Sequence, residues 1–203
     1  LDRHGVTPWL QTFAEDMVVR DGLVTGLVVV NKSGRTIVTA DHFIDCSGDG
    51  DLAVLAGAPY EVSDASGDLQ PISLMFRMSN VDTPSLLRFA QDNVESLAVG
   101  ESEYIRGNRS DKELVDLLVK QGEPSLFFKS EGPFLGDAIR RGDLAPTALI
   151  MIQPTSKARR EVCVNATRLG GNIDGTNTAA VSATVGTLME QVWKTSGFLQ
   201  KRL

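Results

Sequence analysis

Three acids and two glycines lie close together in the segment HFIDCSGDGDLAVLAGAPYE, residues 42–61. The run Gly48-Asp-Gly50-Asp-Leu-Ala53 fits the G-x-G-x-x-G/A pattern of turns that hold the pyrophosphate of a dinucleotide. In such turns glycine lets the backbone approach the phosphates, and the N-terminus of the next helix faces them. Asp49 and Asp51 would instead place negative charge beside the phosphates, at roughly 4 kcal/mol for each pair in contact. Pro59 also ends the helix early, so the charges and the helix length argue against a primary pyrophosphate turn.

The same segment partly fits a calcium-binding loop. Asp45, Ser47, Asp49 and Gly50 match positions 1, 3, 5 and 6 of an EF-hand loop. Position 12, which needs a bidentate acid, would be Ala56, and a strand rather than a helix is expected to enter the loop. The segment therefore lacks one of the ligands that a calcium-binding loop needs.

A third interpretation of the segment is purely structural. Acids in the first turn of a helix are stabilised by the helix dipole and accept hydrogen bonds from its free N–H groups. On this interpretation Ser47 or Asp49 is the N-cap of a short helix and has no functional role.

The composition excludes some classes of function. The chain has 203 residues and a net charge of −6, which argues against non-specific nucleic-acid binding. No apolar run approaches the roughly 18 residues of a membrane span, and no signal peptide is recognisable, which favours a cytoplasmic location. Cys46 and Cys163 lie inside apolar runs and are expected to be buried free thiols. With only two histidines and no Cys/His cluster, we expect no metal site.

The apolar patterns predict an α+β chain. The first part reads as an antiparallel β-meander, a buried strand, a turn and a short helix, and the second as antiparallel strands with helices. Near residues 60–70 the apolar strand and helix patterns give way to polar loop residues, which marks the boundary between the two parts. Strands are expected over 17–20, 23–30, 35–40, 42–46, 72–79, 125–130, 147–155 and 160–169, and helices over 52–58, 82–98, 110–122, 133–143 and 178–203.

Four segments together resemble one family of proteins. The segment over residues 42–61 resembles "vIDATGDGDLAaxAGAP" of bacterial FAD-dependent oxidoreductases, which are glutathione-reductase-like flavoproteins. Upstream, DGLVTGLVVVNKSGRTIVTADHFIDCSGD is similar to the meander that these enzymes place before their Ala-Thr-Gly-type turn. Downstream, LQPISLMFRMSNVD and REVCVNATRLGGNIDGTN are similar to "xQPxTLMFRLxxVD" and "xxVxVNxTRxxGxDGTD". The matches run in family order from about residue 20 to 178.

The resemblance implies FAD as the cofactor and hydride transfer through the flavin as the reaction. It implies that Ser47, Gly48 and Asp49 form a supporting contact to FAD, where the acids need not touch phosphate. The family's N-terminal G-x-G-x-x-G turn and its late Gly-Asp turn are missing from this sequence. Residues 1–62 then correspond to part of an FAD-binding domain, and residues 63–203 to a substrate-binding domain with a long C-terminal helix. We expect a piece of a longer enzyme that does not retain FAD alone.

Three polar residues are candidates for contact with a small-molecule substrate. Arg77 lies among apolar neighbours in a strand, where its guanidinium could hold a carboxylate or hydroxyl group with two hydrogen bonds. Asn165 and Arg168 follow in VNATRL and could meet the flavin or the substrate. No Ser/His/Asp set is apparent, and the catalytic residues stay unassigned. A flavoenzyme needs no such set, because the flavin carries the hydride chemistry.

Two other functions stay open on the sequence alone. One is a non-catalytic ligand-binding or interaction domain that has the same fold and no cofactor. The other is a metal-binding module built on Asp45, Asp49 and Asp51. Neither the substrate nor the electron acceptor follows from the sequence.

Overall fold

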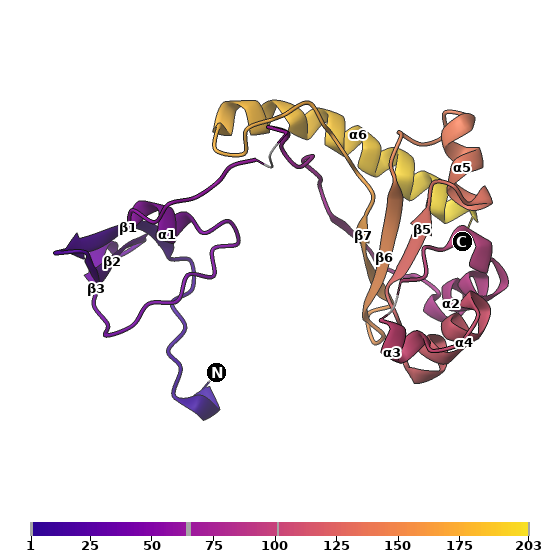
Figure 1. Ribbon diagram of the computed structural model, residues 1–203, viewed down its shortest axis with the longest axis horizontal. Coiled ribbons are helices and arrows are strands. Elements are labelled where there is room, and N and C mark those ends of the chain that lie inside the picture. Colours follow the sequence, from indigo (N-terminus) through magenta and orange to yellow (C-terminus); the bar gives the residue numbers. More distant parts are fainter. Residues whose placement is uncertain (1, 64–65, 101, 203) are drawn as a thin grey trace. The chain divides into compact units, whose positions relative to one another are not determined.

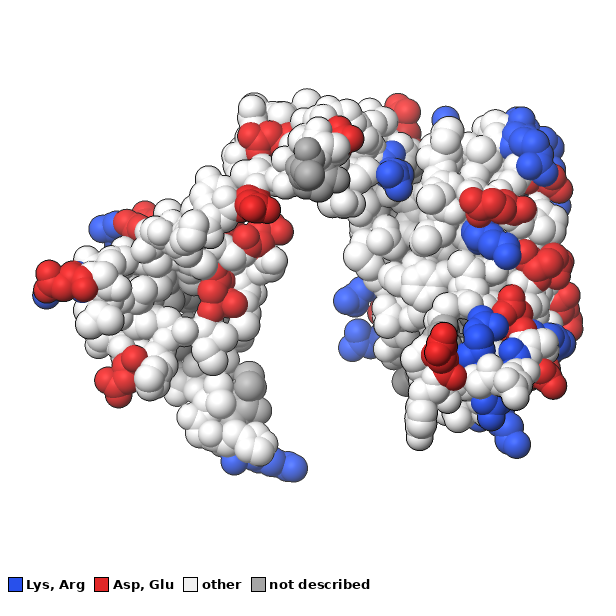
Figure 2. All heavy atoms as spheres, viewed as in Figure 1, with Lys and Arg blue, Asp and Glu red and all other residues white. Residues whose placement is uncertain are grey.

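The computed structural model describes residues 2–63, 66–100 and 102–202. The chain divides into two compact units, Leu1–Val62 and Ser63–Leu203, called unit 1 and unit 2 below (Figure 1). Within the described residues no helix is long and apolar enough to cross a membrane. Acidic and basic side chains are interspersed over unit 2 on the face shown in Figure 2.

Unit 1 is a three-stranded antiparallel meander followed by a short helix. The strands are β1 (Phe13–Arg20), β2 (Leu23–Asn31) and β3 (Gly34–Val38), in the order β1-β2-β3. Asp21 and Gly22 join β1 to β2 with φ values of 50° and 76°. Two positive φ angles define the type I′ hairpin turn that the Asp-Gly pair predicts. A 3₁₀ turn, η1 (Asp2–His4), precedes the meander, and α1 (Asp51–Leu55) follows it.

The prediction of a buried strand over residues 42–46 is wrong. These residues form no strand, and Ile44 is 88% exposed. Cys46 is exposed and Cys163 is half-buried, so the expectation of two buried thiols is also wrong. A short apolar run becomes a strand only where a neighbouring strand accepts its backbone hydrogen bonds. Within the described part of unit 1 the meander supplies no such neighbour to this run.

Unit 2 is built on a four-stranded antiparallel sheet. Its strands are β4 (Phe76–Met78), β5 (Leu126–Lys129), β6 (Leu149–Ser156) and β7 (Glu161–Asn165), in the order β4-β7-β6-β5. The strand expected over 72–79 is shorter than predicted, although Ile72 still forms an isolated bridge with Leu169. The helices are α2 (Thr83–Asp92), α3 (Glu103–Arg106), α4 (Asp111–Gln121), α5 (Pro133–Arg140) and α6 (Thr178–Arg202), with a 3₁₀ turn η2 (Val94–Ser96).

Helices cover one face of this sheet and leave the other face uncovered by unit 2 (Figure 1). Phe128, Ile150, Ile152 and Val164 point to the covered face and are at most 2% exposed. They pack against apolar side chains of α2, α4, α5 and α6. Phe134 of α5 lies 5.0 Å from Phe128 between ring centroids, which adds aromatic contacts to this core. The two units together confirm the α+β class.

Local signals set most helix boundaries in unit 2. Ser110 and Glu113 form the predicted capping box at the start of α4. The Asp82 side chain accepts a hydrogen bond from the Ser85 backbone N–H at the start of α2. The helix expected over 82–98 ends early, at Asp92. There the Asn93 side chain donates a hydrogen bond to the Phe89 carbonyl at 2.8 Å. This bond takes the place of the backbone hydrogen bond that a continuing helix would make to the same carbonyl.

Candidate cofactor turn and substrate face

The glycine-acid turn of unit 1 is held together by the side chains of Asp45 and Ser47. The Asp45 carboxylate accepts hydrogen bonds from the backbone N–H of Ser47 at 2.9 Å and of Ala53 at 3.0 Å. The Ser47 hydroxyl accepts one from the Asp51 N–H at 2.9 Å. Because these donors favour the charged form, chiefly the N–H of Ser47, the pKa of Asp45 is lowered. Asp45 is therefore a structural acid, which the sequence did not single out as a cap.

These hydrogen bonds limit what the turn can bind. The helix α1 has only five residues, and its first N–H groups already have protein acceptors. The N-cap residue is Gly50, with φ 74°, rather than Ser47 or Asp49 as the structural interpretation expected. The start of α1 is thus not arranged to hold a phosphate, in agreement with the charge argument.

The exposed outer side of the turn fits a supporting contact to a large cofactor. Gly48 has φ 101°, and a Cβ atom built there would meet nothing within 4 Å. Ser47, Gly48 and Asp49 are all exposed. A planar or extended ligand can therefore approach the backbone at Gly48 closely, which a larger residue with this φ would prevent.

The acids of the turn do not converge on a cation site. In the described part of the chain no group of three or more His, Cys, Asp or Glu side chains is placed to hold a metal ion. Both carboxylate oxygens of Asp45 are directed at backbone N–H groups. Asp45, Asp49 and Asp51 therefore do not act together as ligands in this arrangement.

In unit 2 the structure brings Arg77 and Asn165 onto the same face of the sheet. Arg77 pairs with Cys163 across β4 and β7, and Asn165 lies two residues further along β7. Since side chains alternate along a strand, Arg77, Cys163 and Asn165 share the face opposite to the buried Val162 and Val164. This uncovered surface of the sheet is called the open face below.

The Arg77 guanidinium is accessible despite an ion pair. It donates to the Glu161 carboxylate at 3.4 Å, while its side chain is 67% exposed. Glu161 also accepts a hydrogen bond from the Thr155 hydroxyl at 3.0 Å. The ion pair is long and uses one guanidinium nitrogen of Arg77, whose side chain is the exposed partner, while Glu161 is only 16% exposed. Arg77 therefore keeps other N–H donors available for a ligand.

The backbone beyond β7 is fixed by two side chains that the sequence interpretation missed. The buried Thr167 hydroxyl donates to the Leu74 carbonyl at 3.1 Å and accepts from the Leu74 N–H at 2.6 Å. The Gln191 side chain of α6 accepts from the Arg168 N–H at 2.8 Å and donates to the Arg168 carbonyl at 3.0 Å. Arg168 itself is exposed, three residues beyond Asn165. We call these two sets of hydrogen bonds the Thr167 clamp and the Gln191 clamp. Both join segments that are far apart in sequence, so no local sequence motif predicts them.

The open face combines these polar groups with apolar ones. Gln153 pairs with Cys163, and Met151 with Asn165, so both belong to the open face. Phe127 pairs with Met151 from the next strand and is 38% exposed. The alternation of side chains along a strand identifies these residues as neighbours only once the pairing register between the strands is known. The open face therefore changes from charged at β4 to apolar at β5.

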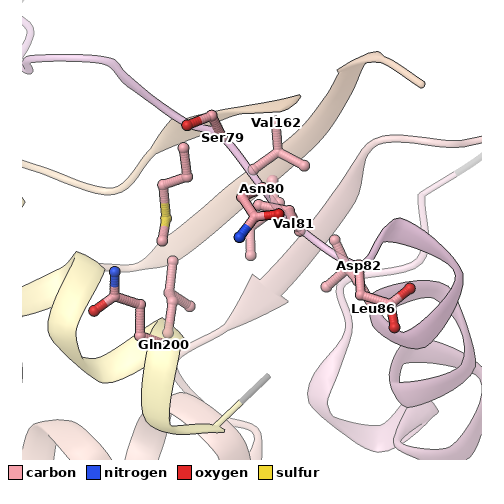
Figure 3. A pocket seen from close by; sticks show the side chains of 10 residues that line it. Ser79, Asn80, Val81, Asp82, Leu86, Val162 and Gln200 are labelled. Atoms are coloured by element: carbon pink, nitrogen blue, oxygen red, sulfur yellow. The ribbon is translucent and has the colours of Figure 1, made fainter. Parts of the chain in front are cut away.

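A separate cavity of about 330 Å³ lies on the helix-covered side of the sheet (Figure 3). Asn80 and the N-cap residue Asp82 lie between β4 and α2, Leu86 comes from α2, and Gln200 comes from the last turn of α6. Its floor is formed by core side chains such as Val162. Arg77, Asn165 and Arg168 are not among its lining residues, so it is distinct from the open face.

The fold and these surfaces define a two-unit α+β protein with a glycine-rich turn after a meander and a helix-backed antiparallel sheet. A family model described as FAD dependent oxidoreductase matches residues 1–203. The chain therefore belongs to the FAD-dependent oxidoreductase family, whose cofactor is FAD and whose function is flavin-linked redox chemistry. No curated protein and no solved structure matches the chain.

Proposed function

We propose that this chain supplies the substrate-binding part and a supporting cofactor contact of a flavin-dependent oxidoreductase acting on a small carboxylated or hydroxylated molecule. The observation that supports it most is the open face, where Arg77, Cys163 and Asn165 lie together on one side of the sheet. Membership of the family supplies the redox chemistry. FAD, when bound, accepts or donates a hydride, and the chain's own residues bind and orient the substrate.

On this proposal Arg77 and Asn165 position the substrate. The planar guanidinium of Arg77 offers parallel N–H donors that match the two oxygens of a carboxylate. The Asn165 amide offers both a donor and an acceptor to a neighbouring hydroxyl or carbonyl group. Arg168 adds a second cation, and the Gln191 clamp fixes the backbone that carries it. No proton-transfer group is assigned among these residues.

Ser47, Gly48 and Asp49 are the proposed cofactor contact. The positive φ of Gly48 and the empty space beside its Cα support a close backbone approach to FAD. The N–H groups at the start of α1 are already bonded, so the pyrophosphate needs another element. This is why we propose that the chain alone does not retain FAD.

The missing element is proposed to be the remainder of an FAD-binding domain that packs on unit 1. Unit 1 exposes many large apolar side chains for its size, among them Leu10 at 80%, Phe13 at 72% and Ile44 at 88%. The outer edges of β1 and β3 also have no strand beside them in the described sheet. Exposed apolar surface and open strand edges of this kind are sites of further packing.

The experiment is to purify the complete product of the gene and to record its flavin absorbance. Under the proposal it is yellow, its flavin is bleached by a subset of small hydroxy acids, and the 203-residue chain alone binds no FAD in a fluorescence titration. Arg77→Met in the complete product should raise KM for a carboxylated substrate about 10²-fold, with Arg77→Lys between the two. Arg35→Met, which changes an exposed ion pair in unit 1, is the matched control.

Two results would count against the proposal. A colourless complete product that is indifferent to FAD favours a non-catalytic domain of the same fold. A yellow product whose KM is unchanged by Arg77→Met keeps the flavin chemistry and moves the substrate away from the open face.

A further inference from the structure

The helix α6 carries a second apolar stripe in addition to the one that packs on unit 2. Leu188, Thr195, Phe198 and Leu199 face the core. On the outer side Val185, Met189 and Trp193 recur every four residues and are 49%, 39% and 74% exposed. A tryptophan this exposed is typical of a contact surface, because its large ring gains much from burial. We call these three residues together with Gly197 the outer stripe.

The outer stripe ends in a depression. Gly197 continues the four-residue spacing, and a Cβ atom built there would meet nothing within 4 Å. Trp193, Gly197 and Lys201 are among the residues that line a cavity of about 350 Å³ at this place. The stripe thus places two medium-sized apolar side chains, a large ring and a hollow in that order along one ridge of the helix.

We propose that the outer stripe is the contact between two copies of this chain, whose α6 helices cross in an antiparallel arrangement. Helices that pack through ridges with four-residue spacing cross at about −50°. If the two-fold axis passes near residue 191, Val185 of one copy lies opposite Gly197 of the second, and Met189 lies opposite Trp193. Val185 then enters the hollow at Gly197, and the Met189 thioether meets the edge or face of the indole.

The charges beside the stripe are complementary under the same symmetry. Glu190 and Lys194 are both exposed and lie on the same flank of the helix. Among the ion pairs of the described residues none joins Glu190 to Lys194. In the antiparallel arrangement Glu190 of each copy lies within one helical turn of Lys194 of the other, so that two ion pairs form across the axis. In a parallel arrangement the two-fold axis would run along the helices and would put this flank of the two copies on opposite sides, so these ion pairs could not form.

The stripe is small, and this sets the expected affinity. Three partly exposed side chains and two ion pairs lie at the low end of specific interfaces, so we expect a dissociation constant on the order of micromolar. The 203-residue chain should therefore change from monomer to dimer over an accessible concentration range in sedimentation velocity. Trp193→Lys should weaken the dimer at least tenfold. Trp9→Lys, which changes the 53% exposed tryptophan of unit 1, should leave it unchanged.

A charge-exchange experiment distinguishes this contact from any effect within one copy. Glu190→Lys and Lys194→Glu should each weaken self-association at least tenfold, because like charges then face each other across the axis. An equimolar mixture of the two variants should form a heterodimer, since every cross-axis pair becomes opposite in charge. An ion pair within one helix cannot restore association on mixing, and circular dichroism melts of each variant report whether it is folded.

Three results would overturn the proposal. The chain could remain monomeric at all concentrations, which would mean that another surface covers the outer stripe. It could form a dimer that Trp193→Lys leaves intact, which would place the contact elsewhere. The mixed charge variants could also stay monomeric while both are folded, which would exclude the antiparallel register.

Discussion

The two units differ in how far they bury their own apolar side chains. In unit 2 the sheet and four helices enclose a core in which Leu114, Phe128, Leu135 and Val164 are fully buried. Among the described residues of unit 1, only Val28 and Val29 are buried large apolar side chains. Small units with few buried apolar groups rarely provide more than about 3–5 kcal/mol of stability. Unit 2 therefore has the core of an independent domain, whereas unit 1 depends on surface that something else must cover.

This difference matches the two roles that we propose. A substrate face needs a rigid support, and the open face is backed by the best-packed part of the molecule. The cofactor turn instead rests on side-chain hydrogen bonds at the surface, from Asp45 and Ser47. A supporting contact of this kind becomes rigid only when the rest of its domain packs around it.

The largest expected effect comes from removing a ring from the core of unit 2. Phe128→Ala should lower the free energy of unfolding of unit 2 by about 3–5 kcal/mol, because Phe128 is fully buried against Phe134. Phe13→Ala in unit 1 should change stability by less than about 0.5 kcal/mol, since Phe13 is 72% exposed. Urea denaturation followed by fluorescence measures both.

Each unit has one tryptophan, so each can be observed separately. Trp9→Phe leaves Trp193 as the reporter of unit 2, and Trp193→Phe leaves Trp9 as the reporter of unit 1. A loss of similar size for Phe128→Ala and Phe13→Ala would mean that unit 1 has a covered core after all. The contrast between the units would then be wrong.

A smaller effect is expected from the Thr167 clamp. Thr167→Val keeps the shape of the side chain and removes the hydroxyl that bonds both backbone groups of Leu74. Because Thr167 is 3% exposed, the two groups of Leu74 lose their partner in a shielded place, and unit 2 should lose about 1–2 kcal/mol.

The matched change in unit 1 is Thr25→Val. The Thr25 hydroxyl donates to the Val18 carbonyl at 3.2 Å but is exposed, so water replaces it and the loss should stay below about 0.5 kcal/mol. Equal losses in the two units would show that burial does not set the strength of these hydrogen bonds. Urea denaturation with the separate tryptophan reporters again gives both values.

The parts of the fold that the sequence predicts are those with local causes. The Asp21-Gly22 turn and the Ser110–Glu113 capping box each depend on residues within four positions of one another, and both are present. Residues 42–46 failed as a strand because strand formation needs a partner, and an apolar run does not reveal whether the partner is there. The early end of α2 is an exception, because its cause is local. The Asn93 side chain donates to the Phe89 carbonyl four residues earlier, and the apolar stripe on which the helix prediction rests does not reveal this bond.

The same distinction between local and long-range causes holds for the candidate sites. The sequence identified the positions of Arg77 and Asn165, but that they share a face follows only from the register of β4 on β7. The clamp from Gln191 to Arg168 spans 23 residues and has no motif. In the turn, the sequence treated Asp45 as one of three possible metal ligands, and only the geometry shows that its oxygens bind backbone N–H groups.

The smallest expected effect compares two acids that play similar roles in the two units, Asp45 and Asp82. Both have pKa values lowered by hydrogen bonds from nearby donors, chiefly the N–H of Ser47 for Asp45 and the hydroxyl of Ser85 for Asp82. A carboxyl group whose folded pKa is below its unfolded value stabilises the fold above the unfolded pKa. That stabilisation is lost as the pH falls through the folded pKa.

The amide signals of Ser47 and Ser85 should therefore titrate with midpoints below 3.8, the ordinary value for Asp, in an NMR pH series. The two units should respond differently to this protonation. Protonation of Asp45 removes an acceptor from the first turn of α1, and with little core behind it the turn should open, so that the Ala53 amide exchanges faster. Protonation of Asp82 should leave α2 in place, because Leu86 and Leu87 are buried in the core. Asp45→Asn should abolish the acid-dependent step in unit 1, and persistence of that step in the variant would assign it to another group.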